Sequence, residues 1–189
     1  MNLPNKLTIS RIILTFVFMF FLFSMVIYAK FIALFIFIIA SLTDYYDGRI
    51  ARKTGQITNF GKLMDPIADK VLTLAAFLAF VELDLIPAWM VVVIIMRELF
   101  ITGVRLVAVG CGLVLAAETA GKHKTTSQVI VIFLMLIFLI AKETTSSIWN
   151  VTFELWFKRV IFYVMLIAVV LSLTSAISFL KRNEKFLCF

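Results

Sequence analysis

A series of long apolar runs constrains this chain more than any other feature. The runs cover about residues 12–28, 31–43, 71–80, 86–109, 127–141 and 160–180. A helix that crosses the hydrocarbon core of a bilayer needs roughly 20 apolar residues, so the shorter runs must extend into their flanking sequence. Because 63% of the 189 residues are hydrophobic and only 15% are charged, the chain is too apolar for a soluble core within a polar shell. The sequence predicts an all-α integral membrane protein with about six transmembrane helices.

The chain length limits what can accompany these helices. Six crossings and short connections use most of the 189 residues, which leaves no room for a separate soluble domain. We therefore expect a single membrane domain over residues 1–189. The polar segment before the first apolar run is expected to form a short amino-terminal interfacial helix.

The basic residues predict the orientation of the helices. If both termini lie on the same side, eleven of the 18 Lys and Arg residues fall there: Lys6, Arg11, Arg49, Arg52, Lys53, Lys62, Lys122, Lys124, Lys181, Arg182 and Lys185. Only four fall on the other side: Lys30, Lys142, Lys158 and Arg159. The positive-inside rule then places both termini in the cytoplasm, in a multi-pass protein of the cell (inner or plasma) membrane. We interpret the net charge of +7 as an attraction to anionic lipid and not as a nucleic-acid-binding surface.

Four aspartates lie at the predicted cytoplasmic ends of two helices. Asp44 and Asp47 are three residues apart, and Asp65 and Asp69 are four apart, so on helices each pair projects from one face. An antiparallel pairing of the two helices would bring all four carboxylates together. Oxygen ligands of this kind suit Mg²⁺, Mn²⁺ or Ca²⁺.

A simpler interpretation treats the same aspartates as solvated charges paired with nearby Arg and Lys side chains. For one pair we would favour that interpretation. For two helical pairs, with Gly48 and Gly61 allowing close approach of a ligand or another helix, we favour a functional site. The two cysteines are far apart and there is one histidine, which does not suggest a thiolate or histidine zinc site.

The aspartate segment resembles the signature of the CDP-alcohol phosphatidyltransferase family. It reads Asp-x2-Asp-Gly-x2-Ala-Arg-x8-Gly-x3-Asp-x3-Asp, and its eight fixed residues are Asp44, Asp47, Gly48, Ala51, Arg52, Gly61, Asp65 and Asp69. The layout of about six helices is also similar, so the resemblance covers essentially the whole chain. The most similar branch transfers the phosphatidyl group of CDP-diacylglycerol to glycerol 3-phosphate, giving phosphatidylglycerol phosphate and CMP in phospholipid biosynthesis.

The resemblance implies a role for each aspartate. Two metal ions, Mg²⁺ or Mn²⁺, would be held by the four carboxylates, with Asp44 and Asp65 contacting both ions. Asp47 would contact the first ion and Asp69 the second. Asp69 also occupies the position of the family's proposed general base, which takes the proton of the attacking hydroxyl. The resemblance further implies a homodimer.

Other positions match residues that contact the CDP part of the donor. These are Gly48, Arg52 and Thr58. The amino-terminal segment 2–11 resembles the segment before the family's first helix, which would place Asn5 and Thr8 near the nucleotide. The alternative for that segment is a plain juxtamembrane anchor whose basic side chains reach the interface.

The acceptor site depends on two further segments. Residues 97–105 and 121–125 resemble segments of the glycerophosphate-using members of the family. An anionic acceptor needs cations, and Arg105, Lys122 and Lys124 could bind its phosphate. The alternative for the lysines is the ordinary positive-inside bias. We interpret Arg97 beside Glu98 as an internal ion pair that orients helices.

Rival functions remain open at the level of sequence. A member of the same family could use another acceptor, such as inositol phosphate, serine or phosphatidylglycerol. A divalent-cation transporter or channel could use the aspartates as a selectivity site, although it gives no role to Gly48, Ala51 and Arg52. An inactive lipid-binding relative is a third alternative.

Overall fold

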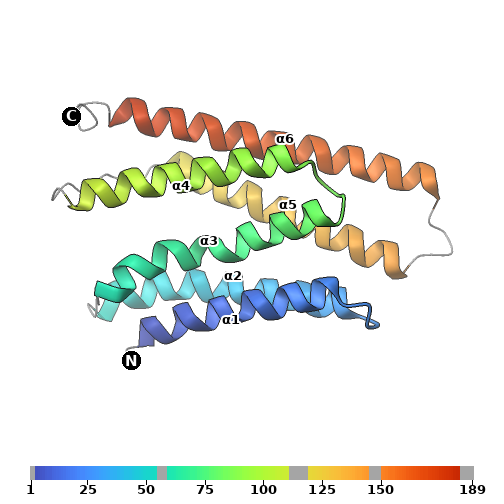
Figure 1. The fold of residues 1–189 in the computed structure, drawn as a ribbon, viewed down its shortest axis with the longest axis horizontal. Helices are drawn as coiled ribbons and strands as arrows, with labels where there is room; N and C mark the ends of the chain where they lie inside the picture. Colours follow the sequence, from blue (N-terminus) through green and yellow to red (C-terminus); the bar gives the residue numbers. More distant parts are fainter. Residues whose placement is uncertain (1–2, 55–58, 111–118, 145–149, 184–189) are drawn as a thin grey trace. The chain divides into compact units, whose positions relative to one another are not determined.

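The computed structural model describes residues 3–54, 59–110, 119–144 and 150–183. Within these ranges it describes the side chains of residues 9–43, 70–108, 124–144 and 150–183. This part of the chain forms helices and contains no strand (Figure 1). The helices are α1 (Leu3–Phe23), α2 (Ala29–Thr54), α3 (Asn59–Glu82), α4 (Ala88–Gly110), α5 (Thr119–Thr144) and α6 (Val151–Arg182). The expected all-α fold is confirmed.

The first helix differs from the prediction. We expected an interfacial helix followed by a separate apolar helix over 12–28, but residues Leu3–Phe23 form one continuous helix. The expected interfacial segment is therefore the first part of α1. Proline at the second position of α1 does not interrupt the helix. The N–H groups of a first turn have no acceptor within the helix, so the missing N–H of proline removes no helical hydrogen bond. The chain turns after Phe23, and Tyr28 adopts a positive φ of 65° just before α2 begins.

The chain divides into two compact units. The first unit comprises Met1–Ala79 and Leu136–Ile148, and the second comprises Phe80–Met135 and Trp149–Phe189. Both α3 and α5 begin in one unit and end in the other. The boundary between the units therefore falls inside helices and not only in connecting segments.

In the first unit, α1 packs against α2. The two phenylalanine rings of Phe18 and Phe37 lie 5.8 Å apart between centroids, and Ala33 and Ala40 of α2 are fully buried. Small residues at these positions allow close approach of the helices, as is common in membrane helix pairs. At the amino-terminal end of α2, the Lys30 ammonium lies 3.0 Å from the Glu143 carboxylate at the end of α5.

In the second unit, α3 ends in a hydrogen-bonded turn that leads into α4. The Leu85 N–H donates to the Phe80 carbonyl and the Asp84 N–H donates to the Val81 carbonyl, both at 3.0 Å. This pair of bonds is the Schellman motif, in which the residue that donates the shorter-range bond adopts a left-handed conformation. Asp84 has a φ of 52° and occupies the position where glycine is most common.

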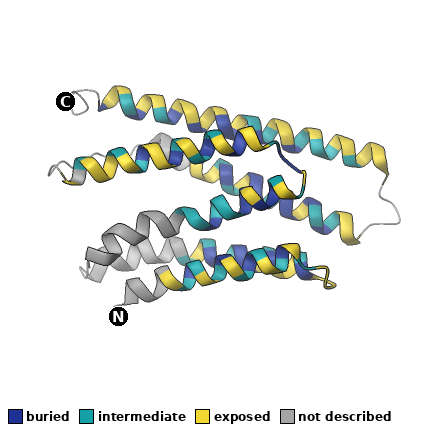
Figure 2. Cartoon of the chain, in the orientation of Figure 1, coloured by how far each residue is buried: buried dark blue, intermediate teal, exposed yellow. Residues whose placement is uncertain are grey.

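Exposed residues recur along the described helices (Figure 2), and many of them are large and apolar. Phe16 and Phe20 of α1 are 72% and 69% exposed, and on α6 the exposed set includes Tyr163, Ile167, Val170 and Ile177. A soluble monomer rarely exposes extended apolar surface of this kind. A lipid environment explains these outward faces.

Two helical stretches of the described chain are long and apolar enough to cross a membrane, Lys124–Thr144 and Val151–Arg182. Ile9–Phe23 and Ala29–Thr43 are shorter apolar stretches. Helix α4 is long as well, but it carries Arg97, Glu98 and Arg105. These features are consistent with a membrane protein, and the number of six crossings stays a prediction.

Candidate active site

The four aspartates lie on two consecutive helices of the first unit. Asp44 and Asp47 belong to the last part of α2, and Asp65 and Asp69 belong to the first half of α3. The helical spacing predicted for each pair is therefore present, so each pair shares one helix face. The side chains of the aspartates lie outside the described residues.

The connection between the two helices limits how far apart the aspartate-bearing ends can be. Helix α2 ends at Thr54 and α3 begins at Asn59, so the two ends are at most about 18 Å apart. The helices run in opposite directions from this connection (Figure 1). The backbone thus brings the two aspartate pairs to the same end of the α2–α3 hairpin.

The donor set at this end suits a hard divalent cation. The segments that carry the aspartates contain no histidine and no cysteine, so carboxylate oxygen is the ligand they offer, as Mg²⁺ and Mn²⁺ prefer. Among the side chains that the structure does describe, no group of three His, Cys, Asp or Glu residues is close enough to bind a metal ion. The aspartates of α2 and α3 are therefore the candidate metal ligands.

The residues predicted to bind the nucleotide lie on α1 and α2, apart from one. Gly48 and Arg52 follow Asp44 at intervals of four residues on α2, which places all three on one side of that helix. Asn5 and Thr8 lie near the start of α1, whose direction is opposite to that of α2 (Figure 1). Asn5 and Thr8 therefore lie at the same end of the α1–α2 pair as Asp44. Their side chains are outside the described residues. Thr58 itself lies outside the described residues.

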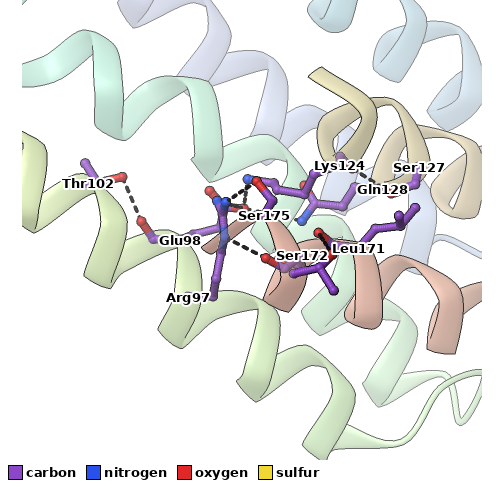
Figure 3. Close-up of polar contacts among 10 residues, drawn as sticks. Arg97, Glu98, Thr102, Lys124, Ser127, Gln128, Leu171, Ser172 and Ser175 are labelled. Carbon is purple, nitrogen blue, oxygen red and sulfur yellow. Dashed lines mark hydrogen bonds and ion pairs between the residues drawn. The ribbon is translucent and has the colours of Figure 1, made fainter. Parts of the chain in front are cut away.

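A second polar cluster lies in the second unit, among buried parts of α4, α5 and α6 (Figure 3). Its centre is Glu98, whose Oε1 atom forms an ion pair with the Lys124 ammonium. The same oxygen lies 3.4 Å from the Gln128 amide nitrogen and 3.5 Å from an Arg97 guanidinium nitrogen. The side chains of Arg97, Glu98 and Lys124 are only 7–8% exposed. Charges this buried are costly unless they are paired, and the cluster supplies the pairing.

Arg97 also connects α4 to α6. Its Nε donates to the Ser172 carbonyl at 3.1 Å, and its Nη2 donates to the Ser175 hydroxyl at 3.0 Å. The Ser172 hydroxyl is buried and has no hydrogen-bond partner in the described part of the chain. The contact between α4 and α6 therefore includes a guanidinium that binds one backbone and one side-chain oxygen.

The three predicted acceptor-binding cations lie in different surroundings. Lys124 belongs to the buried cluster, whereas Arg105 is exposed and its guanidinium carbon lies 5.0 Å from the centroid of the Phe179 ring on α6. This distance is typical of a cation–π contact. Among the contacts that the structure describes, Arg105 makes none with the Glu98 cluster. Lys122 lies on α5 with its side chain outside the described residues.

The ion pair predicted between Arg97 and Glu98 is present, but its main partners were not foreseen. Sequence reasoning missed that Glu98 contacts Lys124 and Gln128, which lie on another apolar run. A usable signal was present: Glu98 is an acidic residue inside a long apolar run, and such a residue needs a cation from another helix. Sequence alone did not identify which cation.

Comparison with known proteins identifies the class. The sequence profile of the CDP-alcohol phosphatidyltransferase family matches residues 1–174, and the chain belongs to this family. The CDP-diacylglycerol–glycerol-3-phosphate 3-phosphatidyltransferase of Bacillus subtilis (strain 168) is 44% identical over 157 residues, which cover 77% of this chain and 81% of that protein.

Two further relatives carry the same name. The protein from Haemophilus influenzae (strain ATCC 51907 / DSM 11121 / KW20 / Rd) is 38% identical over 136 residues, or 68% of this chain and 72% of the relative. The protein from Rickettsia bellii (strain RML369-C) is 30% identical over 191 residues, or 98% of this chain and 97% of the relative. The similarity to proteins of this name thus extends over nearly the full chain.

Proposed function

We propose that this protein transfers the phosphatidyl group of CDP-diacylglycerol to glycerol 3-phosphate, giving phosphatidylglycerol phosphate and CMP. The observation that carries the proposal is the complete aspartate signature at one end of the α2–α3 hairpin. Membership of the CDP-alcohol phosphatidyltransferase family supports the reaction class. The shared name of the relatives supports glycerol 3-phosphate as the acceptor.

In the proposed reaction, Asp69 receives the proton of the attacking glycerol 3-phosphate hydroxyl. The hydroxyl oxygen forms a bond to the phosphorus that carries the diacylglycerol group. The bond from that phosphorus to the CMP phosphate oxygen breaks, and CMP leaves with the electron pair. A carboxylate base needs only to lie within hydrogen-bond reach of the hydroxyl.

Asp44, Asp47, Asp65 and Asp69 would hold two divalent ions, Mg²⁺ or Mn²⁺. When bound, such ions neutralise the diphosphate and stabilise the negative charge on departing CMP. Four carboxylates close together repel one another, and the ions would remove that repulsion.

The remaining site residues would bind the two substrates. Gly48 would allow the nucleotide to approach the α2 backbone, and Arg52 offers a forked donor to phosphate oxygens. Asn5, Thr8 and Thr58 would complete the contacts with the CDP part. Arg105, Lys122 and Lys124 would bind the phosphate of the acceptor.

The membrane arrangement that we propose has six crossings. Both termini and the aspartate-bearing ends of α2 and α3 would face the cytoplasm, in accord with the distribution of Lys and Arg. That side gives the diacylglycerol chains access to lipid and gives glycerol 3-phosphate and CMP access to water. We propose a single domain over residues 1–189, because the unit boundary falls within α3 and α5, and domain boundaries usually fall in exposed linkers. A homodimer is proposed on family resemblance.

An acceptor panel tests the proposal. The purified full chain, in micelles that contain CDP-diacylglycerol and either Mg²⁺ or Mn²⁺, is offered glycerol 3-phosphate, inositol phosphate, serine or phosphatidylglycerol. We expect CMP release with glycerol 3-phosphate and with none of the other three acceptors. Preference for another acceptor would contradict glycerol 3-phosphate as the substrate, while phosphatidyl transfer would remain the reaction class. Divalent-metal flux in liposomes without CMP release would favour a transporter.

A further inference from the structure

Glu98 connects two helices through a single carboxylate oxygen. Lys124 lies on α5 at the start of its described side chains, and Gln128 lies one turn later on the same helix face. Both side chains contact Oε1 of Glu98 on α4. One acidic residue of α4 therefore receives two donors from α5 within one buried cluster (Figure 3).

Glu98 is also connected to α6, through Arg97. Its neighbour Arg97 contacts the same Oε1 atom and is bonded to the Ser172 carbonyl and the Ser175 hydroxyl of α6. The backbone carbonyl of Glu98 also accepts a hydrogen bond of 2.7 Å from the Thr102 hydroxyl. A continuous series of contacts thus runs from α6 through Arg97 and Glu98 to Lys124.

The lysine side chain needs such support to act at a defined position. A lysine carries its charge on a flexible four-carbon stem and loses rotamer entropy when it is ordered. A carboxylate that is itself held by a second helix removes most of that freedom before the ligand arrives. Functional side chains supported in this way bind more tightly, because the ordering cost does not fall on the binding step.

We propose that Glu98 is a positioning residue for the acceptor: its carboxylate holds the Lys124 ammonium in the place from which it binds the phosphate of glycerol 3-phosphate. The inference rests on the proposed function, and it adds a residue whose effect on the acceptor passes through Lys124. Arg97 supports Glu98 from α6, and Gln128 completes the contacts from α5. Glu98 itself need not contact either substrate.

The first experiment compares steady-state constants for both substrates. Glu98→Gln keeps the shape of the side chain and removes its charge, whereas Glu98→Asp keeps the charge. We expect Glu98→Gln to raise the KM for glycerol 3-phosphate about tenfold or more while the KM for CDP-diacylglycerol changes less than about twofold. Glu98→Asp should recover part of the loss. The control is Glu154→Gln, which removes a partly exposed carboxylate 3.4 Å from Lys158 on α6 and should leave both constants unchanged.

The second experiment tests whether Glu98 acts through Lys124. Lys124→Met alone should lower kcat/KM for glycerol 3-phosphate about a hundredfold, and adding Glu98→Gln should lower it no more than about twofold further. Additive losses would overturn the positioning role. So would a Glu98→Gln variant that melts at the wild-type temperature with an unchanged KM for the acceptor, or one that raises both KM values equally.

The two proposals fail in different ways. A wild-type protein that released no CMP with glycerol 3-phosphate would overturn the proposed function and this inference with it. An active wild type combined with additive losses would overturn only the role of Glu98. Where Glu98→Gln lowers the melting temperature strongly, the Glu98→Asp constants and the double variant at a temperature below its transition decide the question.

Discussion

The proposed chemistry demands the most from Asp69, because this residue would be both a metal ligand and the general base. Its place on α3, four residues after Asp65, is compatible with both roles. Replacing it with asparagine keeps an oxygen ligand and removes the proton acceptor. The two roles can therefore be separated by experiment.

Asp69→Asn should lower turnover by about a hundredfold or more, since general-base catalysis typically contributes 10²- to 10⁴-fold. The fold should persist, so the melting temperature should stay close to that of the wild type. CMP release at increasing Mn²⁺ measures the effect. Excess Mn²⁺ should restore part of the activity of Asp47→Asn but little of that of Asp69→Asn, and near-normal activity of Asp69→Asn would remove it as the base.

Asp84 carries a conformational cost that glycine would not. Its φ of 52° closes the α3 Schellman turn, and a residue with a Cβ atom is disfavoured there. Asp84→Gly should raise the stability of the folded protein by about 0.5–1 kcal/mol. Thermal unfolding in detergent micelles measures it. Asp84→Ala is the matched control and should show no such gain, and a gain for both variants would trace the effect to the lost charge.

At the level of elements, Arg97 of α4 forms two hydrogen bonds with α6. Ser175 gives Arg97 a hydroxyl acceptor at 3.0 Å, whereas Ser172 contributes its backbone carbonyl and leaves its hydroxyl without a partner in the described chain. The two serines lie on the same helix and are both buried. They form a natural matched pair for mutation.

Ser175→Ala should destabilise the protein by about 1.5–3 kcal/mol, because it removes a hydrogen bond from a charged group. Ser172→Ala should be neutral or slightly stabilising, since the carbonyl that binds Arg97 remains and an unsatisfied hydroxyl is lost. Unfolding midpoints of the two variants and the wild type provide the comparison. Equal losses for both would mean that the Arg97 contact contributes little.

The sequence predicted helices well and their ends less well. The run 86–109 nearly coincides with α4, and the run 160–180 lies within α6. Length and apolarity are the properties that determine a membrane helix. The run 12–28 extended too far, since the turn before α2 contains apolar residues such as Val26 and Ile27. Apolarity does not mark a turn whose conformation comes from a positive φ at Tyr28.

The candidate site was predictable to a similar extent. The helical spacing of Asp44 with Asp47 follows from local sequence, and both lie on one helix. The pairing of Glu98 with Lys124 depends on how two distant runs pack, which no local pattern contains. The roles of the aspartates and of Thr58 stay predictions, because their side chains lie outside the described residues.

At the level of the whole molecule, the proposed topology makes a sidedness prediction. In a variant with Cys111→Ser and Cys188→Ser, Asn150→Cys should react with a membrane-impermeant thiol reagent in intact cells, because it precedes α6 on the external side. Lys53→Cys should react only after permeabilisation. Mass shifts after labelling measure both, and external labelling of Lys53→Cys would contradict the cytoplasmic placement of the aspartate-bearing ends.

The charged ends of α6 also have a consequence for the bilayer that surrounds it. Lys158 and Arg159 precede the apolar part of this helix, and Lys181 and Arg182 end it. At 1.5 Å per residue the stretch between Arg159 and Lys181 is about 31 Å long, close to the roughly 30 Å of a typical hydrocarbon core. With α6 crossing the membrane as proposed, the spacing of these two basic pairs suits a bilayer of about this thickness. In a thinner bilayer α6 would have to tilt, and in a thicker one a charged pair would be drawn toward the acyl chains. The lipid that this enzyme helps to make would then form part of the bilayer that α6, the longest helix of the described chain, crosses.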